Sequence, residues 1–223
     1  MFIGHFGVGF GAKRVAPRVS LGTLLLAAQF IDLLWPTLLL LGLERVRIAP
    51  GVTAVTPLDF ESYPISHSLI AVCAWALLVG ALHFFVKRDR SSAAVLGGLV
   101  VSHWALDALV HRPDLPLVPG GDVVVGLGAW SSLPLTIVLE GAIFAVGVAL
   151  YSRATEANDG TGRWAFRGLV AFLVAIYGAN LFGPPPPAVE AIAWAGHAQW
   201  LLVVWGYWVD RHRRASRESK VEN

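Results

Sequence analysis

The sequence predicts an all-α fold, a polytopic membrane helix bundle with about six transmembrane helices. Three observations predict it. Of the 223 residues, 56% are hydrophobic and only 14% are charged, whereas a soluble domain carries about 25% charged residues. Apolar runs of about 20 residues, the length that crosses roughly 30 Å of hydrocarbon, recur along the chain. Basic residues also gather on alternate loops between these runs, which is typical of polytopic membrane proteins.

The predicted spans differ in length and apolar character. The five long spans are residues 19–43, 65–86, 92–110, 133–152 and 189–208, and a shorter, weaker one is residues 166–182. An apolar stretch at residues 2–12 is too short to cross a bilayer, so we predict a re-entrant or interfacial half-helix there. The predicted organisation is one integral membrane domain over residues 1–210 and a charged cytoplasmic tail at 211–223.

The distribution of Lys and Arg predicts the orientation. If the first loop is cytoplasmic, 14 of the 17 basic residues lie on the inner side, and only Arg45, Arg47 and Arg112 lie outside. The positive-inside rule then places both termini in the cytoplasm of a cell with this protein in its inner or plasma membrane. Loops 44–64 and 111–132 face outward. The expected partner is the lipid bilayer, with no nucleic acid, and the oligomeric state stays open.

Ionisable residues inside the predicted spans are costly in lipid and are functional hypotheses by default. They are His5, Asp32, His67, His103, Asp107, Glu140 and His197, with His111 at the outer end of a span. At a rise of about 1.5 Å per helical residue, those within the long spans fall in one layer in the outer half of the bilayer. His5 reaches this layer if residues 2–12 re-enter from the cytoplasmic side. We therefore expect these polar side chains to converge.

The third span carries the most regular pattern. His103, Asp107 and His111 are spaced four residues apart, so their side chains lie on one face of a helix. An imidazole and a carboxylate one turn apart can bind the same metal ion, or the carboxylate can orient the imidazole. The alternative is a buried polar contact that only holds helices together.

The set His5, Asp32, His67, His103 and Asp107 combines imidazole with carboxylate. This is ligand chemistry for a divalent metal, zinc above all, with manganese or iron as alternatives. The set suits one metal with an open position, or two metals that share a carboxylate. The single Cys73 excludes a disulfide framework and a cysteine-based zinc site.

Further residues have expected roles around this metal. Glu140 and Asp107 are the candidate catalytic carboxylates, with Glu140 as a further ligand or general base. His111, Arg112 and Trp130 belong to an outer segment that would lie over the site, where Arg112 is placed to contact an anionic headgroup. His197 is a further intramembrane polar residue at a similar depth.

Four short motifs occur in order over about the first half of the chain. They are Gly4-His5-Phe6-Gly7, Phe30-Ile31-Asp32-Leu33-Leu34, Ile65-Ser66-His67-Ser68-Leu69 and His103-Trp104-Ala105-Leu106-Asp107. Their order and spacing resemble the membrane-bound metal-dependent hydrolase family of small bacterial and archaeal polytopic proteins. The same arrangement of His and Asp is similar to that of the soluble zinc-dependent phospholipase C and P1 nuclease proteins, which cleave phosphoesters.

The chain departs from that family pattern at two points. The second motif has Asp32 alone where the family often has two Asp, and Tyr63-Pro64-Ile65-Ser66 stands where it often has Arg-Gly. These departures bear on the number of metals and on any phosphate contact. The resemblance implies a hydrolase whose metal activates water for attack on a phosphoester, or another ester, of a lipid or external substrate. The alternatives are a transporter or ion permease that uses the same polar cluster, and a non-catalytic membrane protein with a structural metal site.

Overall fold

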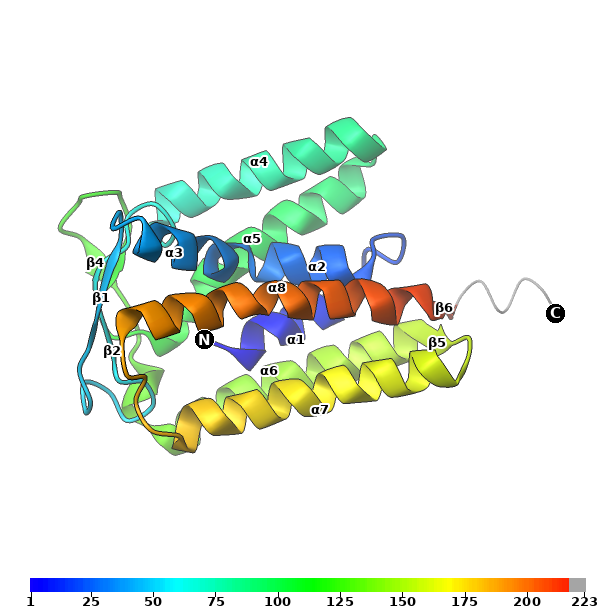
Figure 1. Ribbon diagram of the computed structural model, residues 1–223. Helices are drawn as coiled ribbons and strands as arrows, with labels where there is room; N and C mark the ends of the chain where they lie inside the picture. The colour runs from blue at the N-terminus through cyan, green and yellow to red at the C-terminus, as the bar shows by residue number, and fades with distance from the viewer. Residues whose placement is uncertain (217–223) are drawn as a thin grey trace.

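A computed structural model describes residues 1–216 of the chain, and within them it is predominantly helical (Figure 1). The long helices lie side by side, and short antiparallel strand pairs close the two ends of the bundle. The helices are α1 (Ile3–Ala12), α2 (Leu21–Ala28), α3 (Phe30–Leu40), α4 (Leu69–Lys87), α5 (Arg90–Val110), α6 (Leu133–Ala154), α7 (Gly160–Phe182) and α8 (Val189–Arg211).

Three two-stranded antiparallel sheets and one 3-10 turn complete the described part of the chain. The sheets are the hairpins β1 (Arg45–Ile48) with β2 (Leu58–Ser62) and β3 (Leu115–Pro116) with β4 (Val124–Val125), and the pair of β5 (Thr155–Ala157) with β6 (Arg213–Ala215), and the 3-10 turn is η1 (Ala129–Ser131). The two hairpins lie at the end of the bundle predicted to face outward, and the β5–β6 pair lies at the opposite end (Figure 1). The outer segments 44–64 and 111–132 therefore contain short strands as well as loops.

Four helices are long and apolar enough to cross a membrane, namely α4, α5, α6 and α7. The pair α2 and α3 is bent by 56° at a short break and adds a fifth crossing if it is one broken span. The sixth predicted span forms α8, but Glu190, His197 and Gln199 lower its mean hydropathy. Within residues 1–216, four or five helical segments are therefore able to span a membrane by length and composition, where the sequence predicts about six.

Helix α4 shows the character expected of a surface in contact with lipid. Its residues are strongly apolar, yet Leu77 is 75% exposed and Phe85 is 63% exposed. An exposed apolar surface of this extent is unfavourable in water and favourable in hydrocarbon. The exposed apolar surface of α4 therefore supports membrane insertion independently of the composition.

The first helix lies inside the bundle. Phe6 and Phe10 of α1 are fully buried and belong to the main apolar core. Helices α1 and α6 approach so closely that a Cβ added at Gly147 would collide with the backbone of Gly7. Residues 3–12 therefore form a short buried helix, which is not the interfacial arrangement left open by the sequence. Met1 is also buried in the bundle.

The break between α2 and α3 shapes the site. Gln29 is the single residue between the two helices, the C-cap of α2 and the N-cap of α3, with backbone angles outside the helical region. The last carbonyls of a helix have no partner within it, so the Ala28 carbonyl is left to accept a side-chain hydrogen bond. Asp32 falls in the first turn of α3, directly after the bend.

The C-terminal segment differs in part from the prediction of a separate tail beginning at 211. Helix α8 continues to Arg211, and β6 then pairs with β5. Backbone pairing of this kind makes residues 211–216 part of the folded molecule. The remaining tail residues, 217–223, lie outside the described residues.

Candidate metal centre

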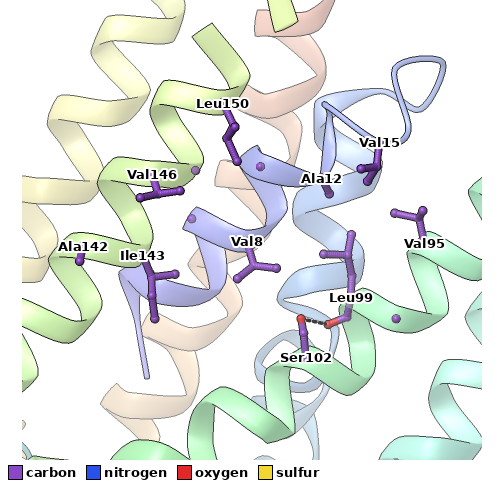
Figure 2. A pocket seen from close by; sticks show the side chains of 14 residues that line it. Val8, Ala12, Val15, Val95, Leu99, Ser102, Ala142, Ile143, Val146 and Leu150 are labelled. Carbon is purple, nitrogen blue, oxygen red and sulfur yellow. Dashed lines mark hydrogen bonds between the residues drawn. The ribbon is translucent and has the colours of Figure 1, made fainter. Parts of the chain in front are cut away.

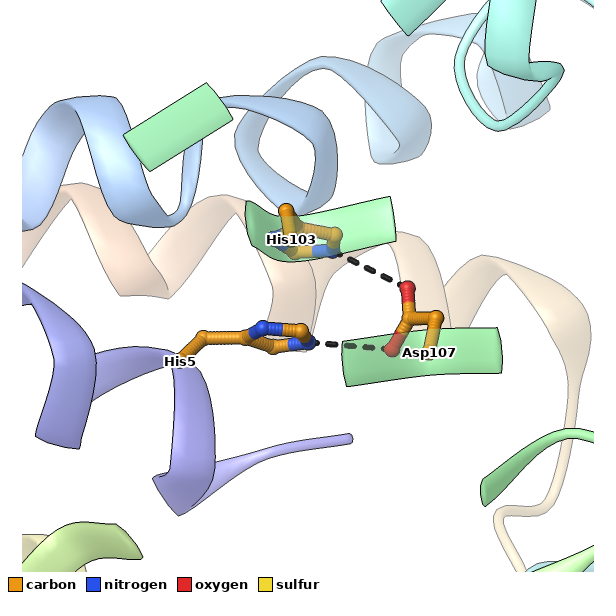
Figure 3. A group of neighbouring side chains, drawn as sticks. All are labelled: His5, His103 and Asp107. Atoms are coloured by element: carbon orange, nitrogen blue, oxygen red, sulfur yellow. Dashed lines mark hydrogen bonds and ion pairs between the residues drawn. The ribbon is translucent and has the colours of Figure 1, made fainter. Parts of the chain in front are cut away.

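The structure brings together the five side chains that the sequence predicts as metal ligands. They come from α1 (His5), α3 (Asp32), the segment before α4 (His67) and α5 (His103 and Asp107). Two groups of possible ligand atoms each lie within 4.8 Å of one another, and they share His103. One group is His5, His103 and Asp107 (Figure 3), and the other is Asp32, His67 and His103.

His103 has its ring orientation set by the helix break. Its Nδ1 lies 2.8 Å from the Ala28 carbonyl oxygen. Because a carbonyl can only accept, Nδ1 carries the proton, and Nε2 of the neutral ring keeps a lone pair. That Nε2 lies 3.5 Å from Oδ1 of Asp32 and 3.3 Å from Oδ2 of Asp107. It is buried and has no hydrogen-bond partner.

His67 is oriented in the same way by different atoms. Its Nδ1 lies 2.7 Å from Oγ of Ser66, and that hydroxyl lies 2.5 Å from Oε2 of Glu44. The Nε2 atom of His67 lies 3.6 Å from Oδ1 of Asp32 and 3.8 Å from Oδ2 of Asp107. Both rings therefore turn Nε2 toward the same two carboxylates.

His5 completes the cluster from the first helix. Its Nε2 lies 3.0 Å from Oδ1 of Asp107, and its ring stacks on that of His103 with centroids 3.6 Å apart. Its Nδ1 is buried with no hydrogen-bond partner. The α-amino group of Met1 is also buried and lies 2.5 Å from Oδ1 of Asp107. Asp107 is thus the acceptor at the centre of the cluster.

The arrangement of lone pairs is unfavourable without a cation. Two neutral imidazoles that turn Nε2 lone pairs toward the buried Asp107 and the partly buried Asp32 place negative potential on negative potential. Burial of charge without a compensating partner costs several kcal/mol, and a proton or a metal ion between these atoms removes that cost. Imidazole nitrogen and carboxylate oxygen are ligands of zinc, so the residues present fit a divalent metal.

Access to the cluster differs among its members. The side chain of Asp32 is 21% exposed, whereas those of His5, His103 and Asp107 are at most 2% exposed. A small molecule would therefore reach the cluster past Asp32. This geometry matches a metal site with protein ligands on most sides and one open side.

Glu140, the predicted ligand or general base, contacts the start of α1. Its Oε2 accepts from the backbone N–H groups of Phe2 at 2.8 Å and Gly4 at 3.4 Å. A carboxylate at this position satisfies free N–H groups at a helix N-terminus and interacts favourably with the helix dipole. Glu140 therefore holds the first turn of the helix that carries His5.

His111 and Trp130 lie above the cluster in a packed aromatic group. Their ring centroids are 4.3 Å apart, and Phe60 lies 4.8 Å from His111. Nδ1 of His111 donates to Oδ1 of Asp114 at 2.9 Å. Both His111 and Trp130 are buried, so the outer segments cover the site rather than leaving these side chains free.

Arg112 is engaged by two carboxylates. It donates to Oδ2 of Asp114 at 3.0 Å and to Oδ1 of Asp59. Burial alone would raise the pKa of Asp114, but its hydrogen bond and ion pair with His111 and the contact with Arg112 hold that pKa below its ordinary value. Burial next to Asp114 raises the pKa of Tyr63, so its hydroxyl stays protonated and donates to Asp114 at 3.0 Å. The Arg112 guanidinium, which the sequence predicts to contact a headgroup, is thus part of an ion-pair network with Asp114 and Asp59.

His197 lies apart from the cluster. Its Nε2 is 3.1 Å from Oγ1 of Thr37, and its Nδ1 is 2.9 Å from the carbonyl oxygen of Ala193. These contacts join α8 to α3. His197 shares the depth of the cluster but belongs to a helix contact.

An apolar groove of about 600 Å³ lies between α1, α5 and α6 (Figure 2). Val8, Val95 and Leu150 are among its lining residues, and Ser102 is its polar member. None of the five clustered side chains lines it. This groove is a hollow in the apolar surface and is separate from the candidate metal centre.

Two polar residues of the site are missing from the sequence prediction. Glu44 is only 2% exposed and Ser66 is fully buried, and both stand behind His67. Ser66 belongs to one of the four motifs, so its position beside a candidate ligand was a usable signal. Glu44 had no such signal, because it lies at the end of an apolar run and 22 residues before Ser66.

Comparison of the chain with protein-family models, curated proteins and solved structures finds no match to any of the three.

Proposed function

We propose that this protein is a membrane-embedded, metal-dependent hydrolase that acts on a phosphoester or another ester. The observation that carries the proposal is the pair of Nε2 lone pairs, from His67 and His103, that face Asp32 and Asp107. With His5 they provide three imidazoles and two carboxylates in two adjacent groups that share His103. A divalent metal bound there, zinc above all, would supply a Lewis acid that activates water and polarises a phosphoryl or acyl oxygen.

The chain's own residues divide the remaining tasks. His5, His67 and His103 would hold the metal together with Asp32 and Asp107. The apolar and aromatic cover formed by Phe60, Trp130 and their neighbours limits access of bulk water. A site of low dielectric strengthens the electrostatic interactions within it. Partial exposure of Asp32 leaves one approach for substrate.

The proposed substrate is a lipid ester, or an external ester that reaches the outer half of the bilayer. The cluster lies within a bundle whose surface is apolar and exposed on α4, and the hairpins β1–β2 and β3–β4 close one end of this bundle (Figure 1). A lipid headgroup is an ester or phosphoester already present at a membrane surface. The ordered resemblance of four motifs to a membrane-bound hydrolase family supports the same chemistry.

The transport alternative has less support. Transport of protons or metal ions requires a polar path from the cluster to the cytoplasmic side. Within residues 1–216, the region on that side of the cluster is packed by fully buried apolar side chains such as Phe10 and Leu24. A hydrolase needs access from one side only, which agrees better with this packing.

The decisive experiment measures metal and activity on the same detergent-purified samples. We expect the wild-type protein to retain about one or two zinc ions per chain and to hydrolyse bis(4-nitrophenyl) phosphate, a chromogenic phosphodiester. His103→Ala should lose both. His197→Ala is the matched control, because that histidine lies in a span but contacts Thr37 and Ala193. Wild-type protein that holds no metal after purification with added zinc would contradict the proposal.

A further inference from the structure

A buried carboxylate stands behind one of the three clustered histidines. Glu44 is 2% exposed, and its two oxygens have different partners. Oε1 accepts from the backbone N–H groups of Ile65 and Ser66, both at 2.8 Å. Oε2 accepts from the Ser66 hydroxyl at 2.5 Å, and that hydroxyl is 2.7 Å from Nδ1 of His67. A continuous chain of short contacts therefore leads from Glu44 to the His67 ring.

The direction of each hydrogen bond in this chain follows from chemistry. A carboxylate only accepts, so the single proton of the Ser66 hydroxyl points to Glu44. The Ser66 oxygen must then accept from Nδ1–H of His67. This leaves Nε2 unprotonated, and Nε2 is the atom that lies 3.6 Å from Asp32 and 3.8 Å from Asp107.

The other two histidines of the cluster have weaker support. His103 donates through Nδ1 to a neutral backbone carbonyl. The Nδ1 atom of His5 is buried and has no hydrogen-bond partner. Among the three, only His67 donates to a neutral hydroxyl that is itself hydrogen-bonded to a carboxylate. A negative charge at that position makes the opposite ring nitrogen a stronger electron donor.

We propose that Glu44 is a positioning residue that acts through Ser66 to fix the tautomer of His67 and strengthen its Nε2 as a metal ligand. The proposal rests on the metal centre of the proposed function. The two oxygens of Glu44 allow a separation of roles. Contacts of Oε1 hold the backbone that leads into α4, whereas the contact of Oε2 acts on the ring. Removal of the Ser66 hydroxyl breaks only the contact of Oε2.

The test uses full-length protein in detergent with ¹⁵N-labelled histidine, and His67→Gln identifies the His67 signals. In metal-free wild type we expect His67 with its proton on Nδ1, and in Ser66→Ala we expect that preference to be lost. Zinc affinity, from competition with a chelating dye, should fall about 10- to 100-fold in Ser66→Ala. Ser66→Thr, which keeps a hydroxyl, should restore both properties.

Two further variants control the experiment. Ser102→Ala is the matched control, because Ser102 precedes a clustered histidine but its hydroxyl bonds to the Leu99 carbonyl, so zinc affinity should stay at the wild-type value. Glu44→Gln keeps the size of the side chain and removes its charge. Glu44→Gln takes the place of Ser66→Ala in the test if Ser66→Ala does not fold, and it should weaken zinc binding severalfold.

The outcomes separate this inference from the proposed function. If wild type binds no zinc, the hydrolase proposal fails, while the tautomer of His67 in the metal-free protein still decides the role of Glu44. A wild-type tautomer and wild-type zinc affinity in Ser66→Ala would overturn the inference. If Ser66→Ala does not fold, unchanged zinc affinity in Glu44→Gln would overturn it.

Discussion

At the residue scale, two neutral hydrogen-bond acceptors determine what the cluster can hold. The carbonyl of Ala28 and the hydroxyl of Ser66 each take a proton from a histidine Nδ1. Each contact leaves an Nε2 lone pair facing acidic side chains. Without these hydrogen bonds at Nδ1, the two imidazole rings would be less well oriented as metal ligands. Loss of such a hydrogen bond commonly changes metal affinity by 10- to 100-fold.

Glu140 is the residue whose role is most open to a direct test. It accepts two backbone N–H groups at the start of α1, and a glutamine can still accept both but cannot take a proton from water. We expect Glu140→Gln to keep wild-type folding and metal content and to lose about 100-fold or more in hydrolysis of bis(4-nitrophenyl) phosphate, as for a lost general base. Wild-type hydrolysis in Glu140→Gln would leave Glu140 with the helix-capping role alone.

The five clustered residues were predictable because membrane spans constrain position strongly. A fixed rise per residue gives the depth of each polar group, and the spacing of His103 and Asp107 gives a shared helix face. Glu44 was not predictable in this way. The β1–β2 hairpin pairs Arg45, the residue after Glu44, with Ser62. This pairing brings the segment that follows Ser62 next to Glu44. Loop composition does not reveal such a pairing.

At the element scale, α1 depends on α6 for its position. An added Cβ at Gly7 would lie 2.7 Å from the Ile143 carbonyl oxygen, and one at Gly147 would collide with the backbone of Gly7. Small residues that let helix backbones approach closely are a recurring device in membranes. This contact places α1 deep enough in the bundle for His5 to meet α5.

The helix contact predicts a specific effect of one methyl group. Gly147→Ala must push α1 away from α6, because the atoms it meets are backbone atoms that cannot move aside. We expect a loss of about 1–3 kcal/mol in stability and weaker zinc binding through displacement of His5. Thermal unfolding and zinc competition in detergent measure the two effects.

The control for this variant lies on the same helix. A Cβ at Gly141 meets nothing within 4 Å, and alanine favours a helix by up to about 1 kcal/mol over glycine. Gly141→Ala should therefore be as stable as wild type or more stable. If Gly147→Ala behaves like Gly141→Ala, the close approach of α1 and α6 does not govern the site.

Hydropathy predicted the helical spans better than it predicted their interruptions. The predicted span 19–43 is apolar over most of its length and is predicted as one continuous helix, but the chain breaks at Gln29 and bends by 56°. The bend depends on backbone angles that no average of side-chain hydropathy reports. The weak predicted span 166–182 lies within a longer helix, α7, which begins at Gly160. Asp159 caps the first turn of this helix by accepting from the Gly162 N–H at 2.7 Å.

At the scale of the whole molecule, the two ends of the bundle differ in construction. The hairpins β1–β2 and β3–β4 close one end with the aromatic group of Phe60 and Trp130. The opposite end is closed by β5–β6 and by the buried Lys13, which bonds to Asp210 at 2.9 Å. The candidate metal centre lies nearer the first end, because Asp107 is in the last turn of α5, which leads into β3. Orientation in the membrane therefore decides which compartment supplies its substrate.

The orientation prediction can be tested by cysteine labelling of intact cells. The background is Cys73→Ala, and Ser131→Cys and Asn158→Cys place one thiol at each end of the bundle, at exposed positions. Because the sequence predicts 14 of 17 basic residues on the side of Asn158, the positive-inside rule places that side in the cytoplasm. We expect an impermeant maleimide to label Ser131→Cys directly and Asn158→Cys only after permeabilisation. The reverse labelling pattern would mean that the protein has the opposite orientation. Substrates would then reach Asp32 from the cytoplasm.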